Sequence, residues 1–352
     1  MTLILSNEEI ERILTMADLI PALEDAYVEL LEGKAANGPR SDIVTPTAFG
    51  ADGFYSLKVM DGVIPKFGKG AIRLNSDILS FPATGGSKRR VKMPAAPGGR
   101  YVGLVLLFST DDGAPLMIAP DGVMQRMRVG ATSAIAAKHL ARRDSRSVAI
   151  LGSSGQAKAQ LLGLDAVFTL ADIRVYSPNR DNRERFAAEM SALIGKPVRA
   201  CADGATACKG ADIVACATNS LEPVFFKEWL EPGMYVTSIG SRVNEIERAS
   251  WAAFDVMAIF NDTDAAYALR THGIKLGGDN GEKLPPDLPT LPEIIAGRAH
   301  GRTRASETTC FLNNLGMGYQ FVVAGHVVYE KARALGLGHE LPTEWFTESE
   351  PS

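Results

Sequence analysis

Cysteine and histidine are scarce in this sequence. Its 352 residues include 4 cysteines and 5 histidines. The cysteines form no C-x-x-C pair, and the histidines show neither the H-x-x-x-H nor the H-E-x-x-H spacing of helical zinc sites. We therefore expect neither a disulfide framework nor a metal site.

Long apolar runs are missing as well. The longest, Val102 to Phe108, has the length of a buried strand and falls far short of the roughly 20 residues that span a membrane. The first residues carry no basic patch followed by a continuous apolar stretch. We therefore expect no signal peptide and a cytoplasmic protein.

Charge of one sign does not dominate either. The 37 basic and 41 acidic residues leave a formal net charge of −4, which provides no field to attract nucleic acid or anionic lipid. One short basic cluster, Lys88-Arg89-Arg90 with Lys92, is best explained as a solvated loop. The expected partners therefore exclude nucleic acid and membranes.

The chain does have enough apolar residues to build a large core. They make up 46% of it, and 34 glycines with 19 prolines indicate many tight turns. The amino-terminal part predicts a strand at Thr2–Leu5 and a capping box formed by Ser6 and Glu9. An amphipathic helix is expected over Asp18–Leu31, ending near Gly33.

Short β-rich runs follow up to residue 120. Strands are expected at Phe54–Met60, Ala71–Leu79, Tyr101–Ser109 and Pro115–Ala119. The last two flank Asp111-Asp112-Gly113, which is a hairpin signal. The segment Pro82–Gly99 is rich in glycine, proline, lysine and arginine, and it predicts a loop or lid.

Strands and helices alternate in the second half, after a proline-free helix expected over Gly122–Arg142. The expected strands are Val148–Leu151, Ile173–Tyr176, Asp212–Ala217, Met234–Ile239 and Asp255–Ile259, and the expected helices are Gly155–Val167, Arg180–Leu193 and Thr263–Thr271. Such alternation predicts a parallel sheet covered on both faces.

A glycine- and proline-rich connector occupies residues 276–292, and a short helix is expected at Leu291–Ala296. A long helix is expected from about Thr308 to Leu335, with apolar residues around most of its circumference. Such a helix must be buried, either at a domain interface or against a second subunit.

The segment Val148–Ala157 is the strongest functional signal that the residues give by themselves. A short apolar strand leads into a glycine-containing turn that opens a helix, which is the setting of a dinucleotide-binding loop. The amide groups of a helix start hold a pyrophosphate, so the candidate contacts are Gly152, Ser153, Ser154, Gly155 and Gln156. Ser154 stands where the usual pattern has its second glycine, and a merely structural turn is the alternative.

The end of the second expected strand bears on the choice of cofactor. NAD enzymes commonly carry an acid there that binds the ribose 2′-hydroxyl, and this chain has none. Ser177, Asn179 and Arg180 instead offer donors and a positive charge for a 2′-phosphate, so NADP(H) is preferred over NAD(H). Alternatively, Asn179 is a helix N-cap and Arg180 a solvated residue of the first turn.

Three groups of residues carry a family resemblance. They are Arg128-Val-Gly-Ala-Thr-Ser-Ala134 continuing into Ala136-Ala-Lys-His-Leu-Ala-Arg142, the loop Gly152–Ala157, and Gly301-Arg-Thr-Arg304 ahead of a terminal helix with Val328-Tyr-Glu-Lys-Ala332. Together they resemble the ornithine cyclodeaminase/μ-crystallin family. The resemblance extends over most of the chain and is most specific at residues 114–157.

The resemblance implies an α/β fold with a Rossmann-type doubly wound parallel sheet domain over residues 122–305. A discontinuous α+β domain for substrate binding and dimerisation would combine residues 1–121 with the carboxy-terminal helix in 306–352, and two chains would form a homodimer. Members of the family reduce cyclic ketimines or α-imino acids, oxidise amino acids such as alanine, or cyclise and deaminate ornithine or lysine. One branch serves as a lens protein and hormone binder, so the resemblance implies a range of reactions and no single substrate.

A substrate with a carboxylate beside an imine or amine carbon needs a cationic clamp and a group that exchanges a proton with the nitrogen. Arg40, Lys58 and Arg128 resemble the family's Arg, Lys and Arg set. Arg73 could take the lysine position if the alignment shifts, but only a lysine can act as acid or base when burial lowers its pKa. We therefore prefer Lys58 and keep Arg73 as a less certain substrate contact. The alternative for each is a solvated charge on a strand or helix surface.

The family's cyclodeaminases carry an acid after the strand that ends here at Gly240, whereas this chain reads Ser241-Arg-Val-Asn-Glu245. The missing aspartate counts against ornithine cyclisation. Glu245 could replace it, or could sit in a helix first turn for reasons of the dipole alone. Thr218, Asn219, Ser238 and Gly240 are candidate contacts of the nicotinamide ribose.

The sequence therefore predicts an NAD(P)-dependent oxidoreductase that moves a hydride between nicotinamide and the α-carbon of a small imino or amino acid. One alternative is a cyclodeaminase-type lyase that holds NAD. The other is a non-catalytic NADP-binding protein of the μ-crystallin type.

Overall fold

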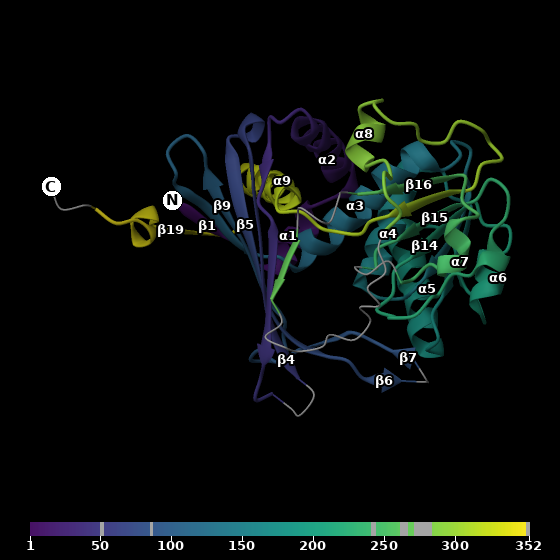
Figure 1. The fold of residues 1–352 in the computed structure, drawn as a ribbon. Helices are drawn as coiled ribbons and strands as arrows, with labels where there is room; N and C mark the ends of the chain where they lie inside the picture. The colour runs from purple at the N-terminus through teal and green to yellow at the C-terminus, as the bar shows by residue number, and fades with distance from the viewer. Residues whose placement is uncertain (50–52, 85–86, 241–243, 261–266, 271–283, 350–352) are drawn as a thin grey trace.

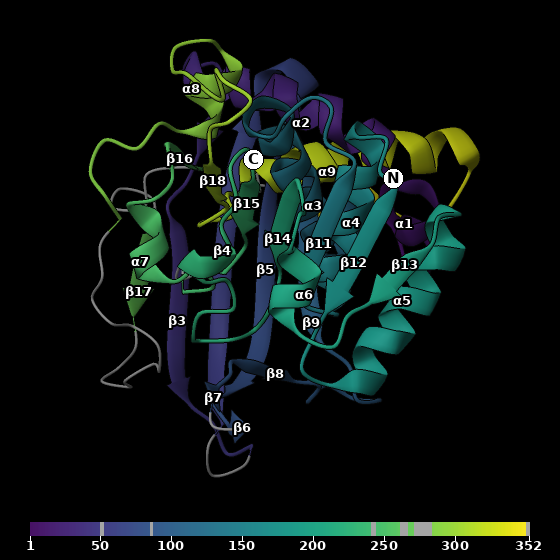
Figure 2. The ribbon, with the colours of Figure 1, turned by 90° about the vertical axis from the view of Figure 1, so that its right-hand side faces the viewer.

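Two large sheets, a small two-stranded one and the helices between and around them make up the described molecule, shown from two sides in Figures 1 and 2. The computed structural model describes the whole chain except residues 50–52, 85–86, 241–243, 261–266, 271–283 and 350–352. In Figure 1 a mixed sheet stands on the left and a parallel sheet on the right. No helix in the described part of the chain is long and apolar enough to cross a membrane.

The mixed sheet brings the two ends of the chain together. Its main path follows the order β17-β3-β4-β5-β9-β10-β1-β19. The bounds of these strands are Thr2–Ile4 for β1, Arg40–Pro46 for β3, Phe54–Ile64 for β4, Lys69–Ser80 for β5, Val102–Ser109 for β9, Pro115–Pro120 for β10, Tyr267–Arg270 for β17 and His339–Leu341 for β19. Two short strands lie off this path, β2 (Ala36–Asn37) on β4 and β8 (Val91–Met93) on β5.

The second sheet is parallel throughout and follows the order β13-β12-β11-β14-β15-β18-β16. Its strands are β11 (Ser147–Leu151), β12 (Asp172–Tyr176), β13 (Val198–Ala200), β14 (Ile213–Cys216), β15 (Tyr235–Ser238), β16 (Val256–Ile259) and β18 (Thr309–Leu312). In β11, Val148 and Ile150 pack into one apolar cluster, while Ala149 and Leu151 pack into another. Both faces are therefore buried, as the uninterrupted apolar strands require.

Several helices pack in and around this arrangement. They are α1 (Asn7–Ile13), α2 (Met16–Leu31), α3 (Gly122–Leu140), α4 (Gly155–Val167), α5 (Arg180–Ile194), α6 (Gly204–Cys208), α7 (Arg248–Trp251), α8 (Leu291–Ile295) and α9 (Tyr319–Leu335). Helix α9 lies against β4 and β5, and α3 packs on α2, α4 and α9. A Cβ on Gly130 of α3 would overlap the Ala159 carbonyl of α4. The glycine in the Arg128–Ala134 motif thus allows two helix backbones to touch.

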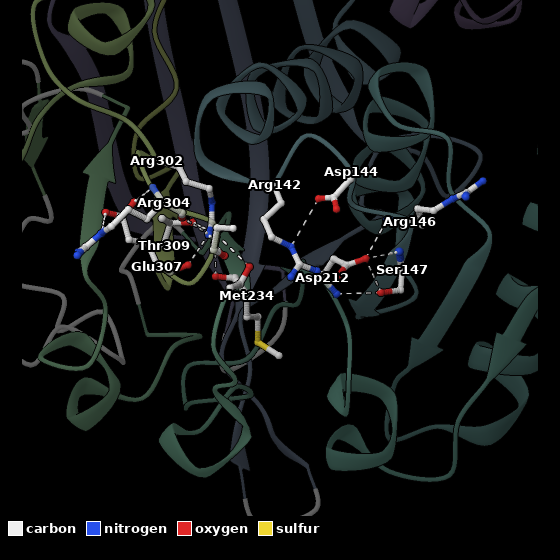
Figure 3. Close-up of polar contacts among 12 residues, drawn as sticks. Arg142, Asp144, Arg146, Ser147, Asp212, Met234, Arg302, Arg304, Glu307 and Thr309 are labelled. Atoms are coloured by element: carbon white, nitrogen blue, oxygen red, sulfur yellow. Dashed lines mark hydrogen bonds and ion pairs between the residues drawn. The ribbon is translucent and has the colours of Figure 1, made fainter.

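The Gly301–Arg304 motif lies at the edge where the parallel strands begin. Arg302 donates to the carbonyl of Leu140 at 2.7 Å, to Thr309 Oγ1 at 2.9 Å and to the carbonyls before β15 (Figure 3). It thereby joins the end of α3 to the starts of β15 and β18. This motif stabilises the fold at the edge opposite the carboxyl ends of the strands.

Much of the expected order of elements is confirmed. The capping box of Ser6 and Glu9 forms, α2 and α4 occupy the expected segments, and β9 and β10 pair across the turn that contains Gly113. The predicted α/β fold class, with a doubly wound parallel sheet and a second sheet-bearing unit, is confirmed. The predicted boundaries at residues 121 and 305 stay a prediction.

Some expected elements are wrong. The long helix from Thr308 is replaced by β18 and by α9, which begins only at Tyr319, because a short apolar run suits a buried strand as well as a helix. Residues 267–270 form a strand where a helix was expected, and the rest of Thr263–Thr271 lies outside the described residues, as do 276–283 of the connector. The segment 82–99 includes the strands β6 (Ala83–Thr84), β7 (Ser87–Lys88) and β8, so it is not only a loop.

Candidate active site

A cleft of about 1980 Å³ separates the mixed sheet from the carboxyl ends of the parallel strands. One wall comes from β3, β4 and β5, and the other from the segments that follow β11, β12, β14 and β15. In open parallel sheets, ligands bind in the crevice outside the carboxyl ends of the strands, where neighbouring connections leave the sheet in opposite directions. Most of the residues singled out in the sequence line this cleft.

The turn after β11 has the shape that a close backbone approach needs. Gly152 has a φ of 126°, and a Cβ there would lie 2.8 Å from the carbonyl carbon of Ala217. The next residues open α4, whose start has no side-chain cap. Ser153, Ser154 and Gln156 line the cleft. An uncapped helix start with donor groups aimed at a cleft is suited to an anion such as a pyrophosphate.

The end of β12 only partly matches the expectation. Ser177 accepts a hydrogen bond from Ser153 at 2.9 Å and lines the cleft, as does Asn179. Asn179 also caps α5 by accepting from the amide of Asn182. The Arg180 side chain is 79% exposed, pairs with Glu184 and does not line the cleft. Ser177 and Asn179 therefore lie together at the cleft, and Arg180 does not.

Glu245 connects the loops that follow β14 and β15. Its carboxylate accepts from the amide and hydroxyl of Thr218 at 2.6 and 2.7 Å, from the hydroxyl of Ser238 at 2.8 Å and from the amide of Gly240 at 2.8 Å. It is fully buried and does not line the cleft. It also lies outside any helix, so the first-turn explanation is wrong. Thr218, Asn219 and Gly240 do line the cleft, Ser238 does not, and residues 241–243 lie outside the described residues.

Strand alternation gathers charged residues on the wall formed by the mixed sheet. Residues two apart on a strand share a face, and the register places Asp42 opposite Lys58 and Lys58 opposite Asn75. The polar residues brought to this face are Arg40, Asp42, Lys58, Arg73, Asn75 and Asp77.

Lys58 lies beside a carboxylate that it shares. Its ammonium is 2.9 Å from Asp77 Oδ2, and Lys92 of β8 is 3.0 Å from the same oxygen. The Lys58 side chain is 5% exposed. Burial, together with the positive charges of Arg90 and Lys92, lowers the pKa of Lys58 to about 7, although Asp77 opposes the shift. At neutral pH this lysine can give or take a proton.

Two of the arginines are already paired with carboxylates. Arg40 donates from Nε and Nη2 to the two carboxylate oxygens of Asp42, at 2.9 and 2.8 Å. Arg73 donates from Nε to Asp121 at 2.8 Å, and its Nη2 lies 2.6 Å from the same carboxylate. The pair of Arg40 is bidentate, whereas both donors of Arg73 reach one oxygen, Asp121 Oδ2. Both pairs offset part of the cost of burying a guanidinium.

Arg128 differs from both, since no carboxylate in the described residues forms an ion pair with it. Its Nη1 donates to the amide oxygen of Gln320 at 2.9 Å, while its buried Nε has no partner among them. Burial and the nearby Arg73 lower the pKa of Arg128 to about 9, so it stays a cation at neutral pH. A Cβ on Gly316 would lie 2.7 Å from Arg128 Cζ, which shows why a glycine is needed there.

A buried polar network holds Gln320 in place behind Arg128. The Gln320 side-chain amide donates at 3.0 Å to both Tyr27 Oη and Thr132 Oγ1, and its oxygen also accepts from the amide of Met317. Thr132 donates to the carbonyl of Arg128 at 2.7 Å, which makes the Tyr27 hydroxyl the donor in its 2.5 Å contact with Thr132. Every hydrogen in this group therefore has one consistent acceptor.

The sequence interpretation missed several of these partners. Asp77, Lys92, Asp121 and Gln320 were not expected at the site. For Asp77 a signal existed, because it follows Arg73 by four residues on an expected strand and must share its face. The other three come from distant segments that only the tertiary structure brings close.

Comparison with known proteins adds to this geometry. A Δ1-pyrroline-2-carboxylate reductase from Bacillus cereus is 29% identical over 241 residues, which cover 68% of this chain and 74% of that protein.

Two solved structures share the fold. The Δ1-pyrroline-2-carboxylate reductase of Thermococcus litoralis, in complex with NADH and L-proline, has a TM-score of 0.78 and 24% identity over 97% of this chain and 100% of its own. An archaeal alanine dehydrogenase dimer with bound NAD also has a TM-score of 0.78 and 24% identity, over 97% of this chain and 99% of its own.

The family model described as "Ornithine cyclodeaminase/mu-crystallin family" matches residues 90–336. This range contains the whole parallel sheet, the helix that carries Arg128 and the segment that carries Lys92. The protein therefore belongs to the ornithine cyclodeaminase/mu-crystallin family.

Proposed function

We propose that this protein is an NAD(P)-dependent oxidoreductase that transfers a hydride between nicotinamide and the α-carbon of a small imino or amino acid. The observation that carries the proposal is Arg128, a buried guanidinium without a carboxylate partner among the described residues, in one cleft with Lys58. The relatives named as pyrroline-carboxylate reductases support the same reaction class.

Arg128 has the role of binding the α-carboxylate of the substrate. A planar guanidinium matches a carboxylate with two parallel hydrogen bonds, and a buried cation gains most from such a partner. Gln320 and Gly316 keep the guanidinium in one orientation. Arg40 has a supporting role, and because Asp42 already engages it, we expect Arg40→Ala to raise KM less than Arg128→Ala.

Lys58 has the role of exchanging a proton with the substrate nitrogen. With a pKa of about 7, it can protonate an imine nitrogen during reduction and accept the proton in the reverse direction. Arg73 cannot do this because a guanidinium keeps its proton, and its bond to Asp121 gives it a structural partner. Lys58 is therefore the better candidate for the proton-exchanging residue.

The segments after β11 and β12 fit a nicotinamide dinucleotide, which would supply or accept the hydride. The Gly152 turn and the uncapped start of α4 suit the pyrophosphate. We propose NADP(H) in preference to NAD(H) for two reasons. No acid stands at the end of β12, in Tyr176–Arg180, to bind a ribose 2′-hydroxyl, and Ser177, Asn182 and Arg185 line that part of the cleft. Fluorescence titration with NADPH and NADH tests this preference, and a tighter Kd for NADH contradicts it.

A homodimer is part of the proposal. Strand alternation gives the mixed sheet a second face, opposite Lys58, that carries half-exposed apolar residues: Leu57, Val59, Ile72, Leu74, Leu106 and Ile118. A second copy of the chain would cover this face, and an archaeal relative is described as a dimer. Light scattering measures the mass in solution, and a monomer at micromolar concentration contradicts the proposal.

The cyclodeaminase alternative receives less support. Ornithine cyclisation needs an acid that activates the attacking amine. Glu245 is the candidate acid from the sequence, but donors of two loops hold its carboxylate and it does not line the cleft. Release of ammonia from ornithine without a net change in cofactor absorbance would favour the alternative.

The test of the proposed function is oxidation of NADPH or NADH with α-keto acids plus ammonia or methylamine, and with cyclic imines. We expect turnover by the wild type and a loss of at least about 100-fold in kcat for Lys58→Met, because general acid catalysis contributes about 10²–10⁴-fold. Absence of turnover on the whole panel, or unimpaired turnover by Lys58→Met, overturns the proposal.

A further inference from the structure

The charges at the substrate end of the cleft do not balance. Arg40 and Arg73 are each neutralised by an aspartate of their own. Lys58 and Lys92 share Asp77, the one carboxylate among the described residues that pairs with either. Arg128 has no carboxylate partner in the described part of the chain, and Arg90 also lines the cleft. With Lys58 protonated, Lys58, Lys92 and Arg128 therefore carry three positive charges against the single described carboxylate of Asp77.

Two of these cations come from a segment that crosses the cleft. The strand β8 pairs with the end of β5, as Figure 2 shows near the lower end of that strand. Just before β8, the amide of Arg90 donates to the carbonyl of Asn219 at 3.2 Å, and Asn219 Nδ2 donates back to the carbonyl of Arg90 at 3.2 Å. The segment is thus anchored to both walls, and it carries Arg90 and Lys92 over the site.

Lys92 is held in place and still has capacity to bind a ligand. Its ammonium has three N–H groups, of which two are directed at Asp77, 3.0 Å away, and Asn75, 3.3 Å away. The side chain is 41% exposed and lines the cleft. The third N–H can therefore donate to an anion in the cleft.

Resting on the proposed function, we propose that the substrate carries a second carboxylate, on its side chain, which binds Lys92. The α-carboxylate neutralises the charge of Arg128. The side-chain carboxylate neutralises the second of the two ammonium charges that share Asp77. The substrate class is therefore an amino- or imino-dicarboxylic acid. With a monocarboxylic substrate, Lys58 and Lys92 would still share the single carboxylate of Asp77 among the described residues, which is electrostatically less favourable.

The kinetic test compares two dicarboxylic keto acids, oxaloacetate and 2-oxoglutarate, with two monocarboxylic ones, pyruvate and 2-oxobutyrate, each with ammonia and NADPH. At pH 6 Lys58 is protonated, so the comparison isolates binding. We expect a dicarboxylic acid to have the highest kcat/KM. We also expect Lys92→Met to reduce the ratio of dicarboxylic to monocarboxylic kcat/KM by about 10- to 100-fold, the value of one charge-assisted hydrogen bond.

A matched lysine serves as the control. Lys138 has a side chain 40% exposed and pairs with Glu24 at 2.6 Å, and it does not line the cleft. Lys138→Met should leave the ratio at its wild-type value. Lys92→Gln, which keeps a donor, should fall between Lys92→Met and the wild type, and this order excludes mere misfolding of the segment.

A binding measurement stands beside the kinetics. In thermal unfolding, succinate or glutarate should raise Tm more than propionate at equal concentration, and Lys92→Met should remove the difference. Monocarboxylic acids that are used as well as dicarboxylic ones overturn the inference and leave the proposed function intact. If no substrate turns over, the proposed function fails, and equal shifts in Tm from succinate and propionate then overturn the inference separately.

Discussion

Replacing Lys92 should move the proton affinity of Lys58 upward. Both ammonium groups lie within 3.0 Å of one oxygen of Asp77. At a separation of about 6 Å and an effective dielectric constant of about 20, two like charges repel by about 3 kcal/mol, or about 2 pKa units. The Lys92 side chain is 41% exposed, so solvent screens part of this repulsion, and about 1 unit is a realistic shift.

The sign of the change follows from the charges that surround Lys58. Burial, Arg90 and Lys92 disfavour its protonated form, and Asp77 favours it. In Lys92→Gln one repulsive charge disappears while Asp77 remains, so protonation becomes easier. The pKa of Lys58 should rise from about 7 to about 8.

The assay is the pH dependence of kcat/KM for reduction of a preformed cyclic imine that carries one carboxylate. This choice removes the equilibrium with ammonia and the second carboxylate from the measurement. Reduction needs protonated Lys58, so the wild type should lose activity above about pH 7, whereas Lys92→Gln should lose it about one pH unit higher. NMR titration of ¹³Cε-labelled lysine, assigned with Lys58→Arg, gives the pKa without turnover. Lys138→Gln is the control, and an unmoved or lowered pKa in Lys92→Gln refutes the reasoning.

Three further substitutions test the surroundings of the site. Gln320→Leu removes the oxygen that accepts from Arg128 and from the Met317 amide. The free energy of unfolding should therefore fall by about 3 kcal/mol, with a lower Tm, and KM for carboxylate substrates should rise. An unchanged KM contradicts the positioning role of Gln320. Gly316→Ala should raise KM about 10-fold or more, because its Cβ meets the Arg128 guanidinium, with kcat less affected; steady-state kinetics decides. Arg302→Met should lower the free energy of unfolding by about 3 kcal/mol in urea titrations and leave kcat/KM unchanged, since its bonds lie at the far edge of the sheet; altered kinetics in the folded variant would contradict this.

The nucleotide-binding half was the easier part to predict because its signals are local. An apolar strand, a glycine turn and a helix start follow one another within Val148–Ala157, and the structure has β11 and α4 there. The strand β3 was missed because its sequence Arg-Ser-Asp-Ile-Val-Thr-Pro presents charges where a buried face would carry apolar residues. Its charged positions face the cleft. The functional residues therefore interrupt the apolar alternation by which a strand is predicted.

The candidate cations could be found one by one, but their partners could not. Arg73 bonds to Asp121, 48 positions away in the sequence, and Arg128 bonds to Gln320, 192 positions away. Strand register and helix packing determine these contacts, and no local sequence pattern predicts them. Among the described residues Arg40 has a carboxylate partner and Arg128 has none. The sequence does not show this difference, although it decides which arginine is the better carboxylate ligand.

Arg128 also couples stability to ligand binding. A buried cation without an anionic partner costs several kcal/mol. No carboxylate in the described ranges pairs with Arg128, and the Gln320 dipole and the face of Phe321 at 5.3 Å offset only part of that cost. A substrate carboxylate offsets more of it when it binds, so the same residue that destabilises the free protein strengthens the complex. Replacing Arg128 by methionine should therefore raise the Tm of the free protein, or leave it unchanged, while removing the stabilisation by carboxylate ligands. A variant that unfolds more easily in the absence of ligand would show instead that the bond to Gln320 outweighs the cost of the buried charge.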